Sequence, residues 1–264
     1  MNLELLCSRV CDLTNQVGEF IRAERKIFKD ASIEYKGHND LVSYVDKTAE
    51  QKIVESLSSL LPEAGFITEE NTSIKKGEAY NWIIDPLDGT TNFIHGIPCY
   101  CISIALMKDE KLILGVIYEI NQDECFYAFE NGGAFLNGSK IFVSTVPELK
   151  KSLMATGFPY SNYSRMKEYM HVFEHMMHNT HGLRRLGSAA VDLAYVACGR
   201  FEGFYEYGLN SWDVAAGAII VKEAGGKVSD FTGGNNFIAE REIIACNSYV
   251  YEELLGVIKE KFVQ

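Results

Sequence analysis

One segment of twelve residues, 82–93, constrains the fold and the chemistry of this chain most strongly: Trp-Ile-Ile-Asp-Pro-Leu-Asp-Gly-Thr-Thr-Asn-Phe. Its apolar start predicts a strand that leads directly into Asp85 and Asp88. Carboxylates at the carboxyl end of a strand can hold hard divalent cations, which prefer oxygen ligands and keep waters for a substrate phosphate. Gly89 lets the backbone approach an anion, and the N–H groups of residues 89–91 would begin a helix, where phosphate is favoured. A metal ion and a phosphate would then meet within one helical turn.

The same segment has a simpler interpretation, a strand followed by a turn. Asp-Pro and Asp-Gly both favour turns, and either dipeptide alone would favour that interpretation. Here two acids, Pro86, Gly89 and paired threonines fall within one short window. The string closely resembles the Asp-Pro-(Ile/Leu)-Asp-Gly-Thr-Thr signature of the inositol monophosphatase family, whose members are magnesium-dependent and lithium-sensitive phosphatases. The resemblance extends from the first predicted helix to about residue 247.

The length and charge of the chain restrict the class of protein. Its 264 residues and 47% hydrophobic content suffice for one large domain or two closely packed halves. The 36 acidic residues exceed the 25 basic residues, and the formal charge of −11 argues against direct binding to nucleic acid or to an anionic membrane. A cluster of acids that needs Mg²⁺ fits this balance better.

Neither a membrane span nor a secretion signal is predicted. The sequence lacks a run of about 18 apolar residues, and charges come too early in it for a signal peptide. The seven cysteines are an odd number without a Cys-x-x-Cys pair, which favours reduced thiols over a disulfide framework or a zinc site. We therefore expect a cytoplasmic protein.

Hydrophobic periodicity predicts helices and then hairpins in the first part of the chain. Apolar residues at helical spacing over 6–20 predict an opening helix, and a second helix is predicted over 46–62. The polar segment 35–40 between them is predicted to be a mobile loop. Short apolar runs between turn clusters over 100–144 predict antiparallel strands, with a hairpin turn at 137–139.

The second part of the chain alternates between helices and strands. Helices are predicted over 161–179, 188–198 and 214–223 and from residue 249, and strands over 201–207 and 242–246. This order predicts a layered α+β/α/β architecture. The family resemblance implies more, namely the five-layered αβαβα sugar-phosphatase fold shared with fructose-1,6-bisphosphatase. We expect one inositol monophosphatase-like domain over 1–264, with helices plus an antiparallel sheet in 1–147 and an alternating α/β half in 148–264.

Two further acidic motifs lie at the ends of predicted elements. A short apolar run leads into Glu69 and Glu70, which in isolation would be a solvated charge pair. Trp212 and Asp213 begin a helix rich in small residues, where an isolated aspartate would be an N-cap. Family members share a Trp-Asp-x-Ala-Ala-Gly motif and place a metal-binding glutamate at the position of Glu69. The resemblance therefore favours metal ligation by Glu69 and Asp213.

The resemblance implies two to three Mg²⁺ ions in each active site. When the family's ligand roles are carried over by position, one ion would be held by Glu69, Asp85 and the backbone carbonyl of Leu87. Asp85, Asp88 and Asp213 would hold a second, and a weaker third ion would use Glu69 and waters. Ions so placed lower the pKa of a bound water, neutralise phosphate charge and stabilise the leaving oxygen.

The catalytic and substrate contacts are also implied by the resemblance. Thr90 and Asp46 correspond to the pair that orients or deprotonates the attacking water, and Glu70 would lie close enough to assist. Glu206 has a simpler alternative, an acid at the surface end of a strand. Lys36 lies in a loop that matches a mobile, metal-linked loop of the family, and its simpler alternative is a solvated lysine. The expected substrate-binding residues are Gly89, Thr90, Asp88, Ala189, Glu206 and Asp213.

A competing metal motif lies in the predicted helix 161–179. His171, Glu174 and His175 match His-x-x-Glu-His, and His178 follows one turn later. Two neighbouring methionines, the lack of another strong ligand motif and the separate acid cluster favour a surface or interface helix over a zinc site.

We expect a Mg²⁺-dependent phosphomonoesterase that hydrolyses inositol 1-phosphate, or a related sugar or polyol phosphate, by attack of a metal-activated water. Fructose-1,6-bisphosphatase and 3′-phosphoadenosine 5′-phosphate phosphatase activities remain open, although 187–190 and 205–208 look more like the inositol branch. A mainly regulatory, protein-binding role is the alternative from a different class, because some bacterial relatives contact the transcription machinery. A homodimer is implied by the resemblance alone.

Overall fold

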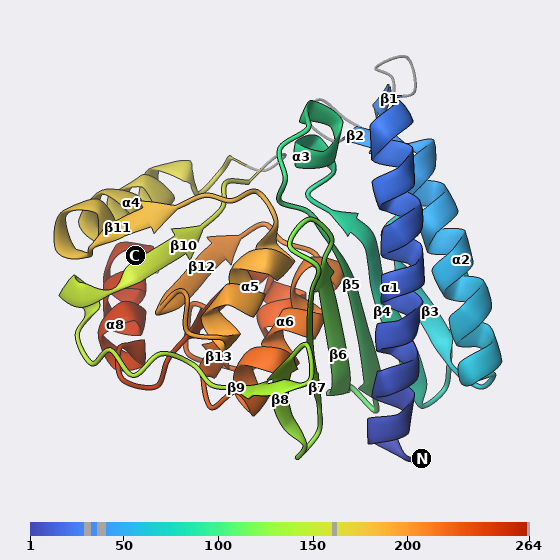
Figure 1. Cartoon of the computed structure of the whole chain (residues 1–264). Coiled ribbons are helices and arrows are strands. Elements are labelled where there is room, and N and C mark those ends of the chain that lie inside the picture. Colours follow the sequence, from blue (N-terminus) through green and yellow to red (C-terminus); the bar gives the residue numbers. More distant parts are fainter. Residues whose placement is uncertain (29–32, 36–40, 160–162, 263–264) are drawn as a thin grey trace.

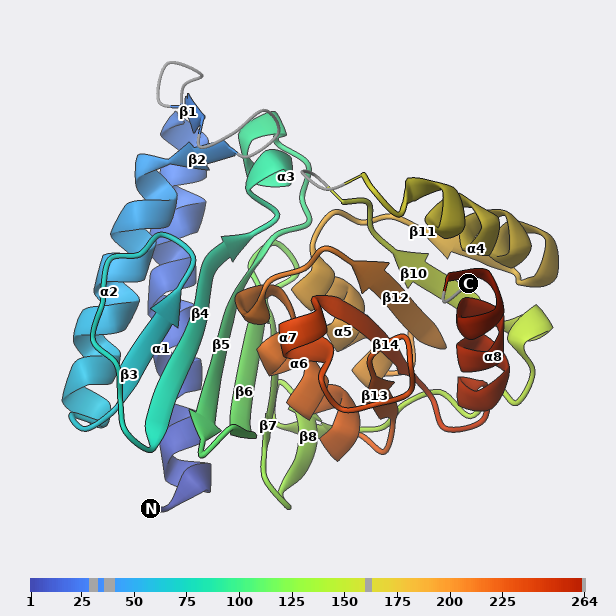
Figure 2. The same ribbon diagram turned by 180° about the vertical axis from the view of Figure 1, so that it is seen from behind.

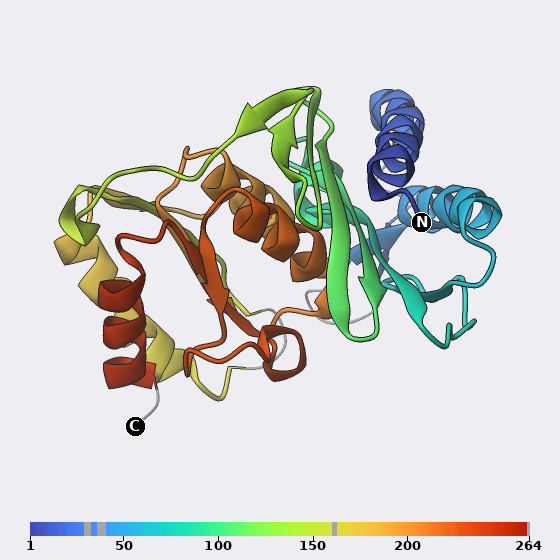
Figure 3. The same cartoon turned by 90° about the horizontal axis from the view of Figure 1, so that it is seen from below.

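Helices and sheets alternate in five layers, an αβαβα sandwich (Figure 3). The computed structural model describes residues 1–28, 33–35, 41–159 and 163–262. Within these residues, three helical layers enclose a seven-stranded and a five-stranded sheet (Figure 1). The five-layered fold that the resemblance implies is thereby confirmed. The helical layers are, in order, α1 (Leu3–Ile27) with α2 (Tyr44–Leu60), α5 (Ala189–Ala197) with α6 (Ser211–Glu223), and α4 (Met166–Asn179) with α8 (Tyr251–Phe262).

The larger sheet contains the strand of the acidic segment. Its strands are β3 (Gly65–Thr68), β4 (Tyr80–Asp88), β5 (Cys101–Lys108), β6 (Lys111–Glu119), β7 (Glu124–Phe129), β8 (Gly133–Leu136) and β9 (Ser139–Ile141). They lie in chain order, with β3 parallel to β4 and every later pair antiparallel, as the hairpin pattern predicts. The register between β4 and β5 shifts between Asp85 and Asp88, where Pro86 has no N–H for the ladder. The two predicted acids therefore lie at the irregular end of β4.

The smaller sheet is mixed. Its strands are β10 (Leu153–Thr156), β11 (Gly182–Arg184), β12 (Gly203–Tyr207), β13 (Lys227–Ser229) and β14 (Glu242–Cys246), in the order β11-β10-β12-β14-β13. β10 pairs in parallel with β11 and β12, whereas β14 is antiparallel to β12 and β13. The sequence predicts β12 and β14 but misses β10, β11 and β13, because runs of three or four residues carry too little periodicity.

Amphipathic burial and capping explain the two outer helices next to the larger sheet. α1 buries Val10, Val17 and Ile21 completely or almost completely in the core that it shares with this sheet. α2 begins with a capping box, since the hydroxyl of Ser43 accepts from the N–H of Val45 at 3.1 Å and the carboxylate of Asp46 accepts from the N–H of Ser43 at 2.9 Å. The start of α2 is thus fixed by the same carboxylate that the resemblance places in the active site.

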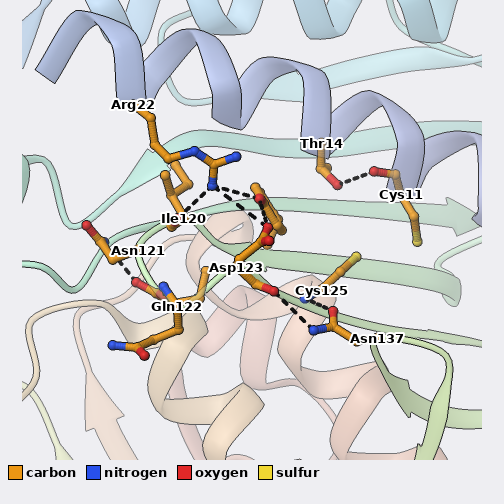
Figure 4. Close-up of polar contacts among 11 residues, drawn as sticks. Cys11, Thr14, Arg22, Ile120, Asn121, Gln122, Asp123, Cys125 and Asn137 are labelled. Atoms are coloured by element: carbon orange, nitrogen blue, oxygen red, sulfur yellow. Dashed lines mark hydrogen bonds and ion pairs between the residues drawn. The ribbon is translucent and has the colours of Figure 1, made fainter. Parts of the chain in front are cut away.

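A polar network ties α1 to the hairpins of the larger sheet (Figure 4). Arg22 Nη1 donates to the hydroxyl of Tyr118 at 2.8 Å. Asn137, in the turn between β8 and β9, accepts from the N–H of Cys125 at 2.8 Å and donates to the carbonyl of Asp123 at 3.0 Å. The hairpin turn predicted at Asn137 is confirmed, and its φ of 48° is one that asparagine tolerates.

Small residues let α5 and α6 approach each other and the larger sheet. A Cβ at Gly217 would lie 2.4 Å from Cβ of Leu193, and one at Gly115 would lie 2.7 Å from the carbonyl of Ala216. Side chains at these positions would force the layers apart. Figure 2 shows both helices between the sheets, with α7 (Phe237–Glu240) next to α6.

The remaining elements are short, and a few boundaries differ from the predictions. β1 (Ile33–Tyr35) pairs with β2 (Leu41–Ser43), α3 (Thr90–His95) follows β4, and a 3₁₀ helix spans Leu149–Lys151. α4 begins at residue 166 instead of 161, and Lys36 lies outside the described residues. None of the helices described has the length and apolarity needed to cross a membrane. All seven cysteines are free.

Candidate metal and phosphate site

Four acidic side chains from three separate segments interact at the carboxyl end of β4. The pKa of Asp85 is raised well above its usual range, first by burial and then by the charges of Glu69, Asp88 and Asp213. Asp85 and Asp88 lie on β4, Glu69 directly follows β3, and Asp213 lies in the first turn of α6. Because β3 and β4 are parallel neighbours, they end at the same edge of the sheet. The structure therefore brings together the four carboxylates that the sequence predicts as metal ligands.

Backbone N–H groups hold two of these carboxylates. Asp85 is only 2% exposed, and its Oδ1 accepts from the N–H of Leu87 at 2.9 Å. Asp213 Oδ2 accepts from the N–H of Asn210 at 2.6 Å. Asn210 is the N-cap of α6, so the simpler interpretation of Asp213 as the N-cap is wrong. Burial and then the charge of Asp88 raise the pKa of Asp213 from its ordinary 3.8 to about 7.

Asp88 connects the two sheets through α5. Its Oδ2 accepts from the hydroxyl of Ser188 and from the N–H of Ala190, each at 2.7 Å. Ser188 is also the N-cap of α5, and Ala189, a predicted substrate contact, lies between the two donors. Burial raises the pKa of Asp88 although these hydrogen bonds lower it. The sequence did not single out Ser188, whose only local signal is that serine is a common N-cap.

A second buried acid, Asp46, contacts the turn after β4. Thr90 Oγ1 donates to Asp46 Oδ1 or to the carbonyl of Leu87, each 3.0 Å away. Since a hydroxyl has a single proton, it can donate to only one of these acceptors at a time. Asp46 is fully buried, and its other oxygen accepts from the hydroxyl of Ser43 at 2.6 Å. Burial raises the pKa of Asp46, and the hydrogen bonds from Ser43 and Thr90 lower it. The Thr90–Asp46 pair suggested by the resemblance is therefore in hydrogen-bond contact.

Gly89 forms the turn between β4 and α3. Its φ of 95° is in the left-handed region, and an added Cβ would lie 3.0 Å from the carbonyl of Cys99 and 3.1 Å from Cβ of Tyr100. Gly89 is the N-cap of α3, as the sequence predicts, and its carbonyl accepts from the N–H of Phe93 at 2.9 Å. The N–H groups of the first turn of α3 thus begin next to Asp88, an arrangement suited to a phosphate.

Glu206 is a buried acid that interacts electrostatically with Asp213 and Asp88. It is 5% exposed on β12, so the alternative of a surface acid is wrong. Burial raises its pKa well above the usual range, and the charge of Arg185 opposes this effect. Asp192 on α5 was not predicted. It is 2% exposed, and its buried Oδ1 has no hydrogen-bond partner among the described residues. Burial, followed by the charges of Glu206 and Asp88, raises its pKa. Two buried acids therefore border the α5 side of the site.

Glu69 and Glu70 lie in a bend directly after β3 and do not form the solvated charge pair that the simpler interpretation expects. Both are partly buried, and the N–H of Glu69 donates to the carbonyl of Ile84 at 3.2 Å. The competing His-x-x-Glu-His motif lies on α4, whose buried face is formed by other residues. On that helix His171 and Glu174 are exposed.

The donors around Asp85 fit a hard divalent cation that retains water. Within the described ranges, no group of three or more His, Cys, Asp and Glu side chains is spaced to hold a metal ion by itself. Mg²⁺ does not require such a group, since it commonly keeps several waters and binds through one or two carboxylates plus substrate phosphates. The donors here are oxygen atoms only, and their mutual repulsion would be relieved by a cation. The full ligand set remains a prediction.

The raised pKa values predict a pH dependence of stability without metal. Because the pKa of Asp213 is about 7 in the folded protein and 3.8 ordinarily, the folded state keeps a proton that the unfolded state releases. The free energy of unfolding in EDTA should therefore fall as the pH rises from about 4 to about 7. Mg²⁺ competes with that proton, so the stabilisation by Mg²⁺ should grow over the same range.

Thermal melts at several pH values, with EDTA and with Mg²⁺, measure both trends. The variant Asp213→Asn is the control, since it should flatten the pH dependence in EDTA. A melting temperature in EDTA that rises steadily from about pH 4 to about pH 7 would contradict the assignment of buried, protonated acids.

Comparisons with known proteins identify relatives of this chain. A sequence profile described as "Inositol monophosphatase family" matches residues 3–262. The chain is 41% identical to a protein of Pseudomonas aeruginosa named Nus factor SuhB, over 92% of this chain and 91% of that protein. It is 39% identical to an inositol-1-monophosphatase of Mesorhizobium japonicum, over 88% of each. The crystal structure of the extragenic suppressor protein suhB from Bartonella henselae superposes with a TM-score of 0.92, at 38% identity over 97% of this chain and 99% of that chain.

Proposed function

The chain belongs to the inositol monophosphatase family, and we propose that it is a Mg²⁺-dependent phosphomonoesterase that hydrolyses inositol 1-phosphate or a closely related polyol phosphate. One observation carries the proposal: the carboxylates of Glu69, Asp85, Asp88 and Asp213 meet beside the start of α3. Oxygen ligands for a metal and N–H groups for a phosphate therefore lie at the same place.

In this proposal, Glu69, Asp85 and the carbonyl of Leu87 hold one Mg²⁺, and Asp85, Asp88 and Asp213 hold a second. A third, weaker ion would use Glu69. When bound, the ions supply a water of lowered pKa and neutralise charge on the phosphate and the leaving oxygen. The carbonyl of Leu87 also lies 3.0 Å from Thr90 Oγ1 and is an alternative acceptor for its proton, so the proposed metal ligand lies next to the proposed proton-transfer group.

The attacking water is oriented by Thr90 and Asp46 in our proposal. The Thr90 hydroxyl can donate to Asp46 and accept a hydrogen bond from the water, so that a proton leaving the water has a path to the buried carboxylate. Glu70, next to Glu69 in the chain, would assist. The phosphate is held by the N–H groups of Gly89 and Thr90.

The leaving alcohol faces the second half of the chain. We propose that Asp88, Ala189, Glu206 and Asp213 contact its hydroxyl groups, which can donate hydrogen bonds to the three carboxylates. We also propose that the chain acts as one domain divided near residue 147, that it forms a homodimer in the cytoplasm, and that lithium inhibits it.

A substrate panel tests the proposed function. Phosphate release should be measured for inositol 1-phosphate, fructose 1,6-bisphosphate and 3′-phosphoadenosine 5′-phosphate, each with millimolar Mg²⁺ and with EDTA. We expect Mg²⁺-dependent release, fastest with inositol 1-phosphate. A preference for another compound would assign the chain to another substrate branch of the superfamily. If none of the compounds released phosphate in a Mg²⁺-dependent way, the proposal would be contradicted.

Gly157 provides a test of the role of Glu206. A Cβ at residue 157 would lie 2.0 Å from Oε2 of Glu206, so Gly157→Ala must displace that carboxylate. We expect kcat/KM for inositol 1-phosphate to fall by roughly 10- to 100-fold, because small misplacements of contact groups are costly. Gly256→Ala is the control, since no atom lies within 4 Å of the added Cβ. An unchanged kcat/KM in Gly157→Ala would exclude Glu206 as a substrate contact.

A second candidate function rests on the relatives named Nus factor SuhB, which include the Pseudomonas aeruginosa protein described above. Their similarity makes a regulatory, protein-binding role a specific alternative. Affinity capture of transcription proteins from the native host separates the two functions. Capture that is unchanged by Asp88→Asn, together with negligible turnover of every phosphate ester in the panel, would favour the regulatory role.

A further inference from the structure

α2 presents two buried carboxylates to the site, one helical turn apart. Asp46 and Glu50 are separated by four residues, a spacing that places them on the same face of the helix. Both are 0% exposed. Asp46 contacts Thr90 on one wall of the site, whereas Glu50 contacts the turn that begins with Glu69 and Glu70.

Glu50 accepts three hydrogen bonds from that turn. Its Oε2 accepts from the N–H of Glu70 at 2.8 Å, and its Oε1 accepts from the N–H and the hydroxyl of Thr72 at 2.9 and 2.7 Å. Between these donors lies Asn71, whose φ of 56° is in the left-handed region that asparagine tolerates. The carboxylate of Glu50 therefore bridges the N–H groups on either side of this residue.

Glu69 is thereby held from both sides. Its own N–H donates to the carbonyl of Ile84, the residue before Asp85 on β4, at 3.2 Å. The next N–H, that of Glu70, donates to Glu50. The backbone of Glu69 is therefore fixed between the strand that carries Asp85 and the helix that carries Asp46.

We infer that Glu50 is a positioning residue that holds the Glu69–Glu70 turn in place for metal binding. The inference rests on the proposed function in that it assigns Glu69 to the metal. Groups that orient metal ligands through hydrogen bonds commonly change metal affinity by 10- to 100-fold when they are removed. Both carboxylate oxygens of Glu50 accept hydrogen bonds from this turn, so we assign it a role through the turn and not as a metal ligand.

Direct titration of the protein with Mg²⁺ alone, by calorimetry without substrate, tests the inference. Glu50→Gln presents an amide NH₂ to donors that require an acceptor, so it should weaken Mg²⁺ binding by about tenfold. Glu55→Gln is the matched control, since Glu55 is an exposed residue of the same helix and should leave the affinity unchanged. Amide hydrogen exchange of the peptide that contains residues 69–72 should be faster only in Glu50→Gln.

The Mg²⁺ dependence of turnover distinguishes a positioning role of Glu50 from a merely structural one. In Glu50→Gln the Mg²⁺ concentration for half-maximal phosphate release should rise about tenfold, while kcat at saturating Mg²⁺ stays within about threefold of the wild type. If Glu50→Gln does not fold, Thr72→Val removes only the hydroxyl that donates to Glu50 and should weaken Mg²⁺ binding by a smaller factor.

Folded Glu50→Gln with wild-type Mg²⁺ affinity would overturn the inference, as would faster exchange of residues 69–72 without weaker binding. Failure of the proposed function has a different signature. A wild-type protein that binds Mg²⁺ but releases no phosphate would contradict the proposed function, and the calorimetric comparison would still decide the role of Glu50.

Discussion

Replacing Asp85 by asparagine is expected to lower Mg²⁺-dependent turnover by about 1,000-fold or more, equivalent to at least about 4 kcal/mol of transition-state stabilisation. The charges of Glu69, Asp88 and Asp213 all raise the pKa of Asp85. Our proposal assigns Asp85 as a ligand of two Mg²⁺ ions. The fold should persist, since the substitution removes a charge from a buried group of like charges. The loss should therefore appear in metal binding and turnover but not in the folded fraction.

Thermal melts separate these effects. Mg²⁺ should raise the melting temperature of the wild type, because a ligand that binds only the folded state stabilises it, and it should raise that of Asp85→Asn much less. Asp12→Asn, an exposed acid on α1, should behave as the wild type. Turnover of Asp85→Asn within about tenfold of the wild type would exclude Asp85 as a metal ligand.

Replacing Thr90 by valine is expected to lower kcat by about 100-fold while Mg²⁺ affinity changes little. The substitution removes the hydroxyl that lies 3.0 Å from both Asp46 Oδ1 and the carbonyl of Leu87. It leaves the carboxylates of the metal site unchanged. The effect should therefore fall on activation of the water and not on metal binding.

The conservative variant Thr90→Ser distinguishes the hydroxyl from the packing of the side chain. It keeps the oxygen that contacts Asp46 and should retain kcat within about tenfold of the wild type. Steady-state kinetics at saturating Mg²⁺, with calorimetric Mg²⁺ titration of each variant, provide the measurement. Equal losses in Thr90→Ser and Thr90→Val would show that the hydroxyl has no role in proton transfer.

The sequence predicted elements with strong local signals. The helical period of apolar residues marks α1, and alternating apolar runs and turns mark the hairpins from β5 to β9. Asp85 and the three acids around it were identified because each lies within a recognisable motif at the end of an element. Glu206 was identified from the family resemblance, but its burial was visible only in the structure.

Residues whose local signal points elsewhere were missed. Ser188 contacts Asp88 across 100 positions of sequence, and Glu50 contacts Glu70 across 20. Ser188 lies within 187–190 but indicates an N-cap, and a glutamate in a helical segment normally indicates a solvated face. Asp192 likewise follows the helical pattern of α5 and is identified only by its unpartnered, buried oxygen. Such contacts depend on how the layers pack, which periodicity does not encode.

The most direct test of the central claim is hydrolysis of inositol 1-phosphate in water labelled with ¹⁸O, with millimolar Mg²⁺ and with EDTA, followed by mass spectrometry of both products. Attack of a site-bound water on phosphorus predicts one labelled oxygen in each phosphate released, none in the inositol, and release only with Mg²⁺. Label in the inositol, or equal release in EDTA, would contradict a metal-dependent phosphomonoesterase at the carboxyl end of β4.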